Sequence, residues 1–404
     1  MFKRFFFYFS FFILSLVLVK TIDFGLSFFV NEQQNSLDTE IRNNINRNVV
    51  LREFSPNQDY YLTPSKDYVE ASKNLERKPY RMRTDENGFI IGSQNIKSQG
   101  EQNLKTDIIF FGGSTTECIY VEEFFRFPHY VSVIMSQKLR RSIVTLNAGF
   151  SGNHSMHSLI NLIAKGLVNK PKFVILMNAA NDVGTFSKTV SYWKAPKRRA
   201  LIQEEKLKST DLFGVDEVNI GDSVYILIHT ISKRVKDLLI PNSWILLRPL
   251  IVKMKKEHFV TEGTDEWEGY RTKKDFKTLY TEFEKQFTFS LKSFIKISKI
   301  WGIEPILMTQ FSRWTFDNTD FKKLYEEKNQ SISFDNFIKL YQLSNQLIKK
   351  VSKEENILLI DLEKVVPKDD RHIYDTLHLS KEGSILVSKI ISDKMIENFY
   401  RIQN

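Results

Sequence analysis

A serine, an aspartate and a histidine of this 404-residue chain stand in contexts that suit nucleophilic catalysis. Ser114 ends the stretch Phe-Phe-Gly-Gly-Ser, directly after an apolar run, and Asp375 and His378 lie three residues apart in Tyr-Asp-Thr-Leu-His. A serine hydroxyl is a poor nucleophile at neutral pH, so it needs a base such as histidine. A carboxylate orients that imidazole and stabilises its charged form. These three residues are therefore the candidate catalytic residues.

Two further residues follow predicted strands and suit an oxyanion hole. Gly152 lies in the stretch 147–155, and Asn181 lies in the stretch 178–182. In open parallel sheets, ligands collect at the carboxyl ends of the strands, so these stretches meet near Ser114. An asparagine amide and backbone N–H groups can hold a developing oxyanion, and each such donor contributes about 3–4 kcal/mol. We predict an oxyanion hole formed by Ser114, Gly152 and Asn181.

Each of these residues alone also has a simple structural explanation. Gly152 could be a flexible joint, Asn181 part of a turn, and His378 a loop histidine near a helix start. A phosphate-binding loop at Gly112-Gly113 is disfavoured because no Lys-Ser/Thr pair follows. The order of the polar residues, each at a strand end, favours a functional site.

Alternating apolar runs and helical periods predict the elements that position these residues. Short continuous apolar runs separated by amphipathic segments are typical of buried parallel strands in an α/β sheet. The expected strands are 107–111, 142–147, 172–178, 304–310 and 356–361, and the expected helices are about 128–141, 155–168, 333–354 and from about 380, with Ser380 as its cap.

Two regions interrupt this pattern. Residues 31–105 are polar and predict a stalk and a lead-in arm, in which Asn87-Gly88 indicates a turn. Residues 185–300 predict a helical insert, with a long helix over about 267–301, within a domain of residues 106–404. We expect the insert to pack over the sheet and border the site. The alternative is a lid that shapes a substrate groove or touches the membrane surface through its Arg, Lys and Trp residues.

The N-terminus carries a membrane-targeting signal. Lys3 and Arg4 precede the uncharged stretch 5–19, which ends at Lys20. This length suits a signal peptide and is short for a helix crossing about 30 Å of hydrocarbon. Because no small-x-small cleavage site follows, we favour an uncleaved anchor within residues 1–30. The basic N-terminus would place the rest of this single-pass protein outside the cytoplasm.

Composition argues against several other classes of protein. The formal charge of +10 comes from Lys and Arg spread along the chain without a nucleic-acid motif, so we expect no nucleic-acid partner. One cysteine, Cys118, excludes an intramolecular disulfide framework and any multi-thiolate metal site. The pair His154 and His157 has no nearby carboxylate in the sequence, so we expect no metal site there.

Together, the four stretches that carry Ser114, Gly152, Asn181 and His378 resemble the sequence blocks of the SGNH hydrolases in the GDSL esterase/lipase superfamily. Ser114, Gly152, Asn181 and His378 match the family's Ser, Gly, Asn and His in order, and Asp375 matches its Asp-x-x-His. The resemblance covers about 105–183 and 303–400 and implies a flavodoxin-like three-layer α/β/α fold. Two departures are Gly-Gly-Ser for Gly-Asp-Ser and Ala-Ala-Asn-Asp for Gly-x-Asn-Asp, and neither removes a catalytic group. Gly-Gly-Ser-Thr-Thr-Glu, preceded by Asn-Gly-Phe, is similar to membrane-anchored SGNH proteins of bacterial envelopes.

The resemblance implies a serine esterase that forms an acyl-enzyme on Ser114 and needs no metal or cofactor. The expected substrate is an acylated glycan or a lipid ester, with O-acetyl groups on envelope glycans preferred because the chain is expected to be tethered beside the membrane. An O-acyltransferase would use the same residues and stays open. A non-catalytic glycan-binding or scaffold protein is the alternative from another class.

Overall fold

The computed structural model describes residues 15, 17–22, 49–72, 74–92, 106–204, 267, 269–326 and 331–400. The chain divides into two compact units. The first contains Met1–Asn48 and Glu204–Glu266, and the second contains Val49–Gln203 and Trp267–Asn404. The second unit contains every candidate site residue. Most of the predicted anchor lies outside the described residues, and none of the helices described is long and apolar enough to cross a membrane.

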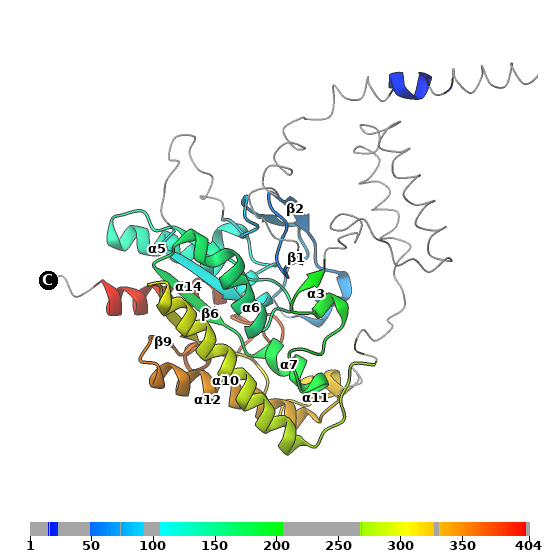
Figure 1. The fold of residues 1–404 in the computed structure, drawn as a ribbon, viewed down its shortest axis with the longest axis vertical. Helices are drawn as coiled ribbons and strands as arrows, with labels where there is room; N and C mark the ends of the chain where they lie inside the picture. The colour runs from blue at the N-terminus through cyan, green and yellow to red at the C-terminus, as the bar shows by residue number, and fades with distance from the viewer. Residues whose placement is uncertain are drawn as a thin grey trace, which may run out of the picture. The chain divides into compact units, whose positions relative to one another are not determined.

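A five-stranded parallel sheet forms the centre of the second unit (Figure 1). The strands are β4 (Ile108–Gly112), β5 (Thr145–Asn147), β6 (Phe173–Met177), β8 (Glu304–Met308) and β9 (Leu359–Ile360). Their spatial order is β5-β4-β6-β8-β9. This order is that of flavodoxin-like doubly wound sheets. The predicted α/β fold with a parallel sheet is therefore confirmed.

Helices cover both faces of the sheet (Figure 1). One face packs against α6 (Ser155–Asn161), α7 (Ala180–Thr189), α10 (Phe276–Ile300) and α12 (Phe334–Glu354), and the other against α5 (Phe127–Leu139) and α14 (Lys381–Phe399). Successive strand residues point to opposite faces, so Ile109 and Phe111 enter the first core while Ile108 and Phe110 enter the second. Both faces are buried, which explains the continuous apolar runs in the sequence.

Shorter elements complete the described chain. They are β1 (Val49–Val50), β2 (Asp59–Leu62), α3 (Lys66–Ala71), β3 (Tyr80–Arg83), α4 (Ser114–Glu117), β7 (Gln203–Glu204), α11 (Thr319–Glu326) and α13 (Leu362–Val365). Single helical turns, 3-10 or π, cover Glu123–Phe125, Leu162–Gly166, Leu167–Asn169 and Lys197–Arg199.

The ends of the predicted insert belong to the helical layer itself. Residues 185–189 complete α7, and α10 buries Phe283, Phe287 and Phe294 in the core of the first face. The long helix begins at Phe276 rather than near 267, because Asp275 caps it by accepting a hydrogen bond from Thr278 N. Residues 205–266 lie outside the described part, so the hypothesis of a lid is untested.

The described part of the lead-in arm, residues 49–72 and 74–92, packs on the sheet. Phe89 is fully buried in the first core, and the Ile90 N–H donates a 2.9 Å hydrogen bond to the Asn147 carbonyl at the end of β5. Gly88 has a φ of 73°, which suits the turn predicted at Asn87-Gly88. The arm thus reaches the sheet edge where the candidate residues gather.

Candidate active site

The turn between β4 and α4 presents the Ser114 side chain at the edge of the sheet. Ser114 is the first residue of α4 and is half-buried, whereas the three residues that follow it are buried. Gly113 precedes it, and a Cβ atom there would lie 2.2 Å from Asn181 Nδ2. The second glycine of the turn therefore permits the close approach of Asn181, and a side chain at this position would displace that amide.

Two consecutive hydrogen bonds join the three candidate catalytic residues, Ser114, His378 and Asp375, and we call this hydrogen-bonded series the catalytic line. Ser114 Oγ lies 2.8 Å from His378 Nε2, and His378 Nδ1 lies 2.6 Å from Asp375 Oδ2. Asp375 Oδ1 accepts hydrogen bonds of 2.7 Å from the backbone N–H groups of Leu377 and His378. The structure thus brings together the three residues that the sequence selects, in the geometry that a nucleophile, a base and an orienting carboxylate require.

Electrostatics fixes the proton positions in this line. Burial tends to raise the pKa of Asp375, but the His378 charge and the hydrogen bonds from His378 and Leu377 lower it to about 2. An ionised carboxylate only accepts hydrogen bonds, so His378 Nδ1 carries the proton and Nε2 is free to accept from the Ser114 hydroxyl. Burial opposes the charged imidazolium, yet Asp375 outweighs it and raises the pKa of His378.

Asn181 lies beside the nucleophile with one amide N–H to spare. Its Nδ2 donates a 2.9 Å hydrogen bond to the Asn153 carbonyl, and a primary amide has two N–H donors. The second can point at a bound oxyanion. The Ser114 N–H has no partner within α4 because it belongs to the first residue of that helix.

Gly152 lies on the loop that passes this turn. Its φ of 81° is in the left-handed region that favours glycine, and a Cβ atom there would lie 2.3 Å from Arg199 Nη1 and 3.0 Å from Arg52 Nη2. The carbonyl of the neighbouring Asn153 accepts a hydrogen bond from Asn181 Nδ2, which also lies close to Gly113. Asn181 therefore contacts both this loop and the turn that carries Ser114. The role of Gly152 as a backbone donor stays a prediction.

Replacing Asn181 by alanine is expected to lower kcat by about 100- to 1,000-fold with a smaller change in KM, because an oxyanion donor acts mainly in the transition state. The Asn153 carbonyl keeps a second donor, the Asn178 side chain at 2.9 Å, so the loop is retained in the variant. Steady-state ester hydrolysis checks this prediction. A change in KM alone would assign Asn181 to substrate binding instead.

Gln310 is a functional candidate that the sequence analysis missed. Its Oε1 accepts a 2.8 Å hydrogen bond from the Ala180 N–H, and its Nε2 donates a 2.9 Å hydrogen bond to Thr115 Oγ1. These partners are the chain neighbours of Asn181 and Ser114, so one buried amide links the candidate oxyanion donor to the turn that carries the candidate nucleophile. Gln310 follows β8 closely, and inspection of every strand end would have found it.

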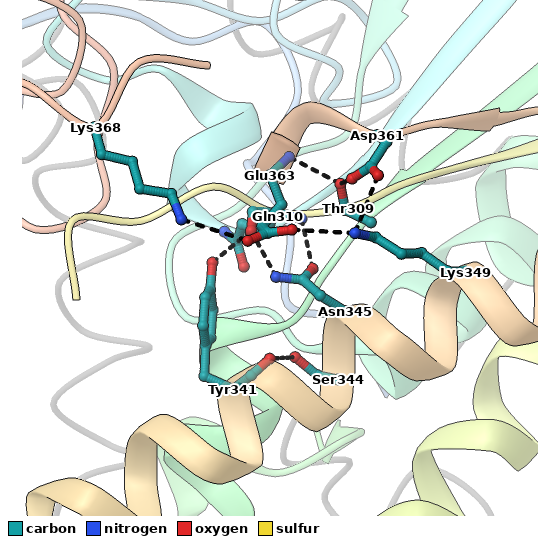
Figure 2. Close-up of polar contacts among 9 residues, drawn as sticks. All are labelled: Thr309, Gln310, Tyr341, Ser344, Asn345, Lys349, Asp361, Glu363 and Lys368. Carbon is teal, nitrogen blue, oxygen red and sulfur yellow. Dashed lines mark hydrogen bonds and ion pairs between the residues drawn. The ribbon is translucent and has the colours of Figure 1, made fainter. Parts of the chain in front are cut away.

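The backbone of Gln310 is held by α12, as Figure 2 shows. Tyr341 Oη and Asn345 Nδ2 donate to its carbonyl at 2.6 and 2.9 Å, and its N–H donates to Asn345 Oδ1 at 2.9 Å. Nearby, Lys349 pairs with Asp361 and Glu363 at 3.0 and 3.1 Å and ties α12 to the end of β9 (Figure 2). By holding the Gln310 backbone, the contacts from α12 keep its side chain between Ala180 and Thr115.

Glu117 is a second residue that the sequence analysis did not select. Burial raises the pKa of its carboxyl group to about 7, and Ser151 Oγ donates to its Oε2 at 2.5 Å. Glu117 thereby joins the helix that carries Ser114 to the loop that carries Gly152. Its position three residues after the nucleophile is visible in the sequence, but its burial is not.

The lead-in arm braces the same loop through Arg52. Its Nε donates to Asn153 Oδ1 at 3.1 Å, and its Nη2 donates to the Ser151 carbonyl at 2.8 Å. The guanidinium also lies 5.5 Å from the centre of the Phe150 ring. Both flanks of Gly152 are therefore fixed by a residue that lies outside the α/β core.

His154, His157 and Cys118 are buried, and none of their side chains hydrogen-bonds to Ser114, His378 or Asp375 within the described part of the chain. The two imidazole rings have their centres 3.8 Å apart and are tilted by 42° to each other, and burial lowers the pKa of His157 to about 3. Burial raises the pKa of the Cys118 thiol to about 12, so the thiol is protonated and unreactive at neutral pH. Within the described ranges, no group of three or more His, Cys, Asp or Glu residues is arranged to hold a metal ion.

Comparisons with known proteins give structural likenesses only. No family model and no curated protein matches this chain. It is similar to a solved lipase/acylhydrolase from Enterococcus faecalis, with 15% identity, a TM-score of 0.36 and coverage of 72% of this chain and 95% of the other. It is also similar to an acetylxylan esterase from Geobacillus stearothermophilus, with 14% identity, a TM-score of 0.37 and coverage of 72% and 96%. A GDSL-like lipase from Bacteroides thetaiotaomicron has 12% identity, a TM-score of 0.36 and coverage of 73% and 91%. Because these identities and TM-scores are low, we infer the function from the geometry of this chain's own residues.

Proposed function

We propose that this protein is a serine esterase of the SGNH type that cleaves small acyl esters through an acyl-enzyme on Ser114. The observation that carries this proposal is the hydrogen-bonded line from Asp375 through His378 to Ser114, with contacts of 2.6 and 2.8 Å. The half-buried position of Ser114 supports it, because the hydroxyl can be reached by an ester while its surroundings are packed.

The reaction follows from the positions of the protons. His378 Nε2 takes the Ser114 hydroxyl proton as Oγ bonds to the ester carbonyl carbon, and the resulting oxyanion accepts from the Ser114 N–H and Asn181 Nδ2. His378 then donates the proton to the leaving alkoxide, which departs as an alcohol. Water attacks the acyl-enzyme while His378 accepts its proton. The intermediate then collapses by breaking the bond to Ser114 Oγ, His378 returns the proton to that oxygen, and the carboxylic acid is released. No step in this cycle uses a metal or a redox group.

The preferred substrate is an O-acetyl group on an envelope glycan, outside the cytoplasm. Lys3 and Arg4, with the apolar stretch 5–19 that follows, support a membrane-tethered position. A tether holds the site near surface polymers, and a lipid ester is the other substrate within reach. Transfer of the acyl group to a sugar hydroxyl proceeds through the same acyl-enzyme and is the second candidate.

Activity is expected to rise with pH through an apparent pKa above 6.5, the ordinary value for histidine, and then to stay level on the alkaline side. His378 must be neutral to accept the Ser114 proton, and Asp375 raises the pKa of His378, so the neutral form appears at higher pH. The measurement is kcat/KM from pH 5 to 9 with a chromogenic acetate ester. A rate independent of pH below neutrality would exclude His378 as the base.

Product analysis tests the proposed function. The purified protein is incubated with an acetylated oligosaccharide, alone and with an unacetylated glycan acceptor, and acetate and acetylated products are quantified by mass spectrometry. Acetate release without acceptor indicates hydrolysis, whereas acetylated acceptor indicates transfer. If neither product forms and a fluorophosphonate also leaves Ser114 unmodified in folded protein, the catalytic proposal is wrong and a scaffold role is favoured.

A further inference from the structure

The hydroxyl group of Tyr68, in the lead-in arm, reaches the carboxylate of the catalytic line. Tyr68 lies on α3, whose start is capped by Ser65 Oγ accepting from the Tyr68 N–H at 3.2 Å. Tyr68 Oη donates a 2.8 Å hydrogen bond to Asp375 Oδ2. This is the oxygen that also accepts from His378 Nδ1 at 2.6 Å. A residue from outside the α/β core therefore shares the acceptor atom that orients the base.

Aromatic packing fixes the Tyr68 ring in this position. The ring centre lies 5.9 Å from that of Tyr120 and 6.2 Å from that of Tyr374, with an edge-on geometry in the second pair. The Tyr374 ring in turn lies nearly parallel to the His378 imidazole, with centres 5.8 Å apart. Burial and the neighbouring Asp375 charge raise the pKa of Tyr68, so its hydroxyl is a permanent donor at working pH.

The arm also holds this region through residues that follow α3. Asn74 Nδ2 donates to the Asp370 carbonyl at 2.8 Å, and Lys78 pairs with Glu122 at 2.7 Å. Leu75 and Tyr80 form a small buried cluster with Tyr374. The Tyr68 hydrogen bond is thus part of a packed interface and not an isolated surface contact.

We propose that Tyr68 is a positioning residue that limits the basicity of His378 by sharing the Asp375 carboxylate, an inference that rests on the proposed function. A donor on Oδ2 holds Asp375 ionised and withdraws part of its negative charge from His378. Without the Tyr68 hydroxyl, the carboxylate attracts the imidazolium proton more strongly. His378 then loses its proton at higher pH, and less of the base form is present near neutrality.

Other charged and titratable groups lie beside the Asp375–His378 pair. Glu117 on α4 raises the pKa of His378 through its charge. Arg313 Nη1 donates to the Ile373 and Asp375 carbonyls at 3.2 Å each. Tyr374 stacks on the imidazole, and Ser114 lies on its other nitrogen. Among the described residues, Tyr68 is the side chain other than His378 that hydrogen-bonds to the Asp375 carboxylate.

Replacing Tyr68 by phenylalanine tests the proposal, since Tyr68→Phe removes the hydroxyl and keeps the ring. The pKa of His378, measured by NMR titration of its imidazole, is expected to rise by about 0.5–1 pH unit. The acid limb of kcat/KM should move upward by the same amount. Tyr120→Phe is the matched control, because its ring packs on Tyr68 while its hydroxyl makes no hydrogen bond to the Asp375 carboxylate in the described structure. Both quantities should stay at the wild-type values in that variant.

An unchanged His378 titration in folded Tyr68→Phe would overturn the inference, as would an equal shift in Tyr120→Phe. The NMR readout does not depend on turnover, so it separates this failure from failure of the proposed function. The latter would appear as an unmodified wild-type Ser114 after treatment with a fluorophosphonate. An upward shift confined to Tyr68→Phe supports the role of the arm.

Discussion

Ser114→Ala is expected to lower kcat for ester hydrolysis by about 10⁴- to 10⁶-fold, the range seen when the nucleophile of a serine hydrolase is removed. The variant lacks the oxygen that bonds to the acyl group, and Asn181 and the backbone donors alone cannot form an acyl-enzyme. Intact-mass analysis after fluorophosphonate treatment should show one adduct on the wild type and none on Ser114→Ala. Hydrolysis kinetics on the same samples give the loss of rate.

His378→Ala is the companion variant in this experiment. It keeps the Ser114 hydroxyl but removes the base 2.8 Å away, so the adduct should form far more slowly. The matched control is His372→Ala, which removes a histidine hydrogen-bonded at 2.7 Å to Asp369. That variant should label at the wild-type rate. Full activity in folded Ser114→Ala would show that the reaction uses another nucleophile.

Asp375→Asn is expected to lower kcat by about 10³- to 10⁴-fold, by analogy with serine proteases whose triad aspartate is replaced by asparagine. The neutral amide no longer stabilises the His378 imidazolium, and its NH₂ group can favour the wrong imidazole tautomer. Because Asp375 outweighs burial in raising the pKa of His378, that pKa should fall in the variant. The acid limb of the pH profile should therefore move to lower pH while the plateau drops.

Asp369→Asn is the control for this prediction. Asp369 and His372 have the same spacing and a similar side-chain hydrogen bond as the catalytic pair, 2.7 Å against 2.6 Å. In Asp369→Asn, kcat should keep its wild-type value, and only the stability of the fold, measured by thermal unfolding, should change. Similar losses of kcat in both variants would mean that the Asp375 substitution acts through folding and not through His378.

Much of the fold could be predicted because its signals are local. The buried strands appear as continuous apolar runs, and Ser380 caps α14 by accepting from the Gly383 N–H at 3.1 Å. The predicted insert was less accurate, because its first residues, 185–189, complete α7, and its long helix begins at Phe276 rather than near 267. Most of the predicted anchor and residues 205–266 of the predicted insert lie outside the described part.

The site residues differ in how far the sequence could identify them. Ser114, Asn181 and His378 follow strands or carry recognisable motifs, so residue type and order were sufficient to select them. Gln310 stands at the end of a predicted strand but carries no recognisable motif, and Tyr68 has neither signal. Gln310 acts through Thr115 and Ala180, which are distant in sequence, and Tyr68 meets Asp375 across 307 positions of the chain.

The sequence by itself predicted the kind of chemistry, since a serine, a histidine and an aspartate in these contexts suit acyl transfer without a metal. It also determined the Asp375–His378 pair, because residues three apart meet through local backbone geometry. The tertiary structure decided which such pair faces the nucleophile: Asp369–His372 forms the same local contact, but only His378 reaches Ser114, 264 positions away. That choice depends on strand order and on the packing of the arm, which arise from long-range burial of apolar surface and not from any short motif.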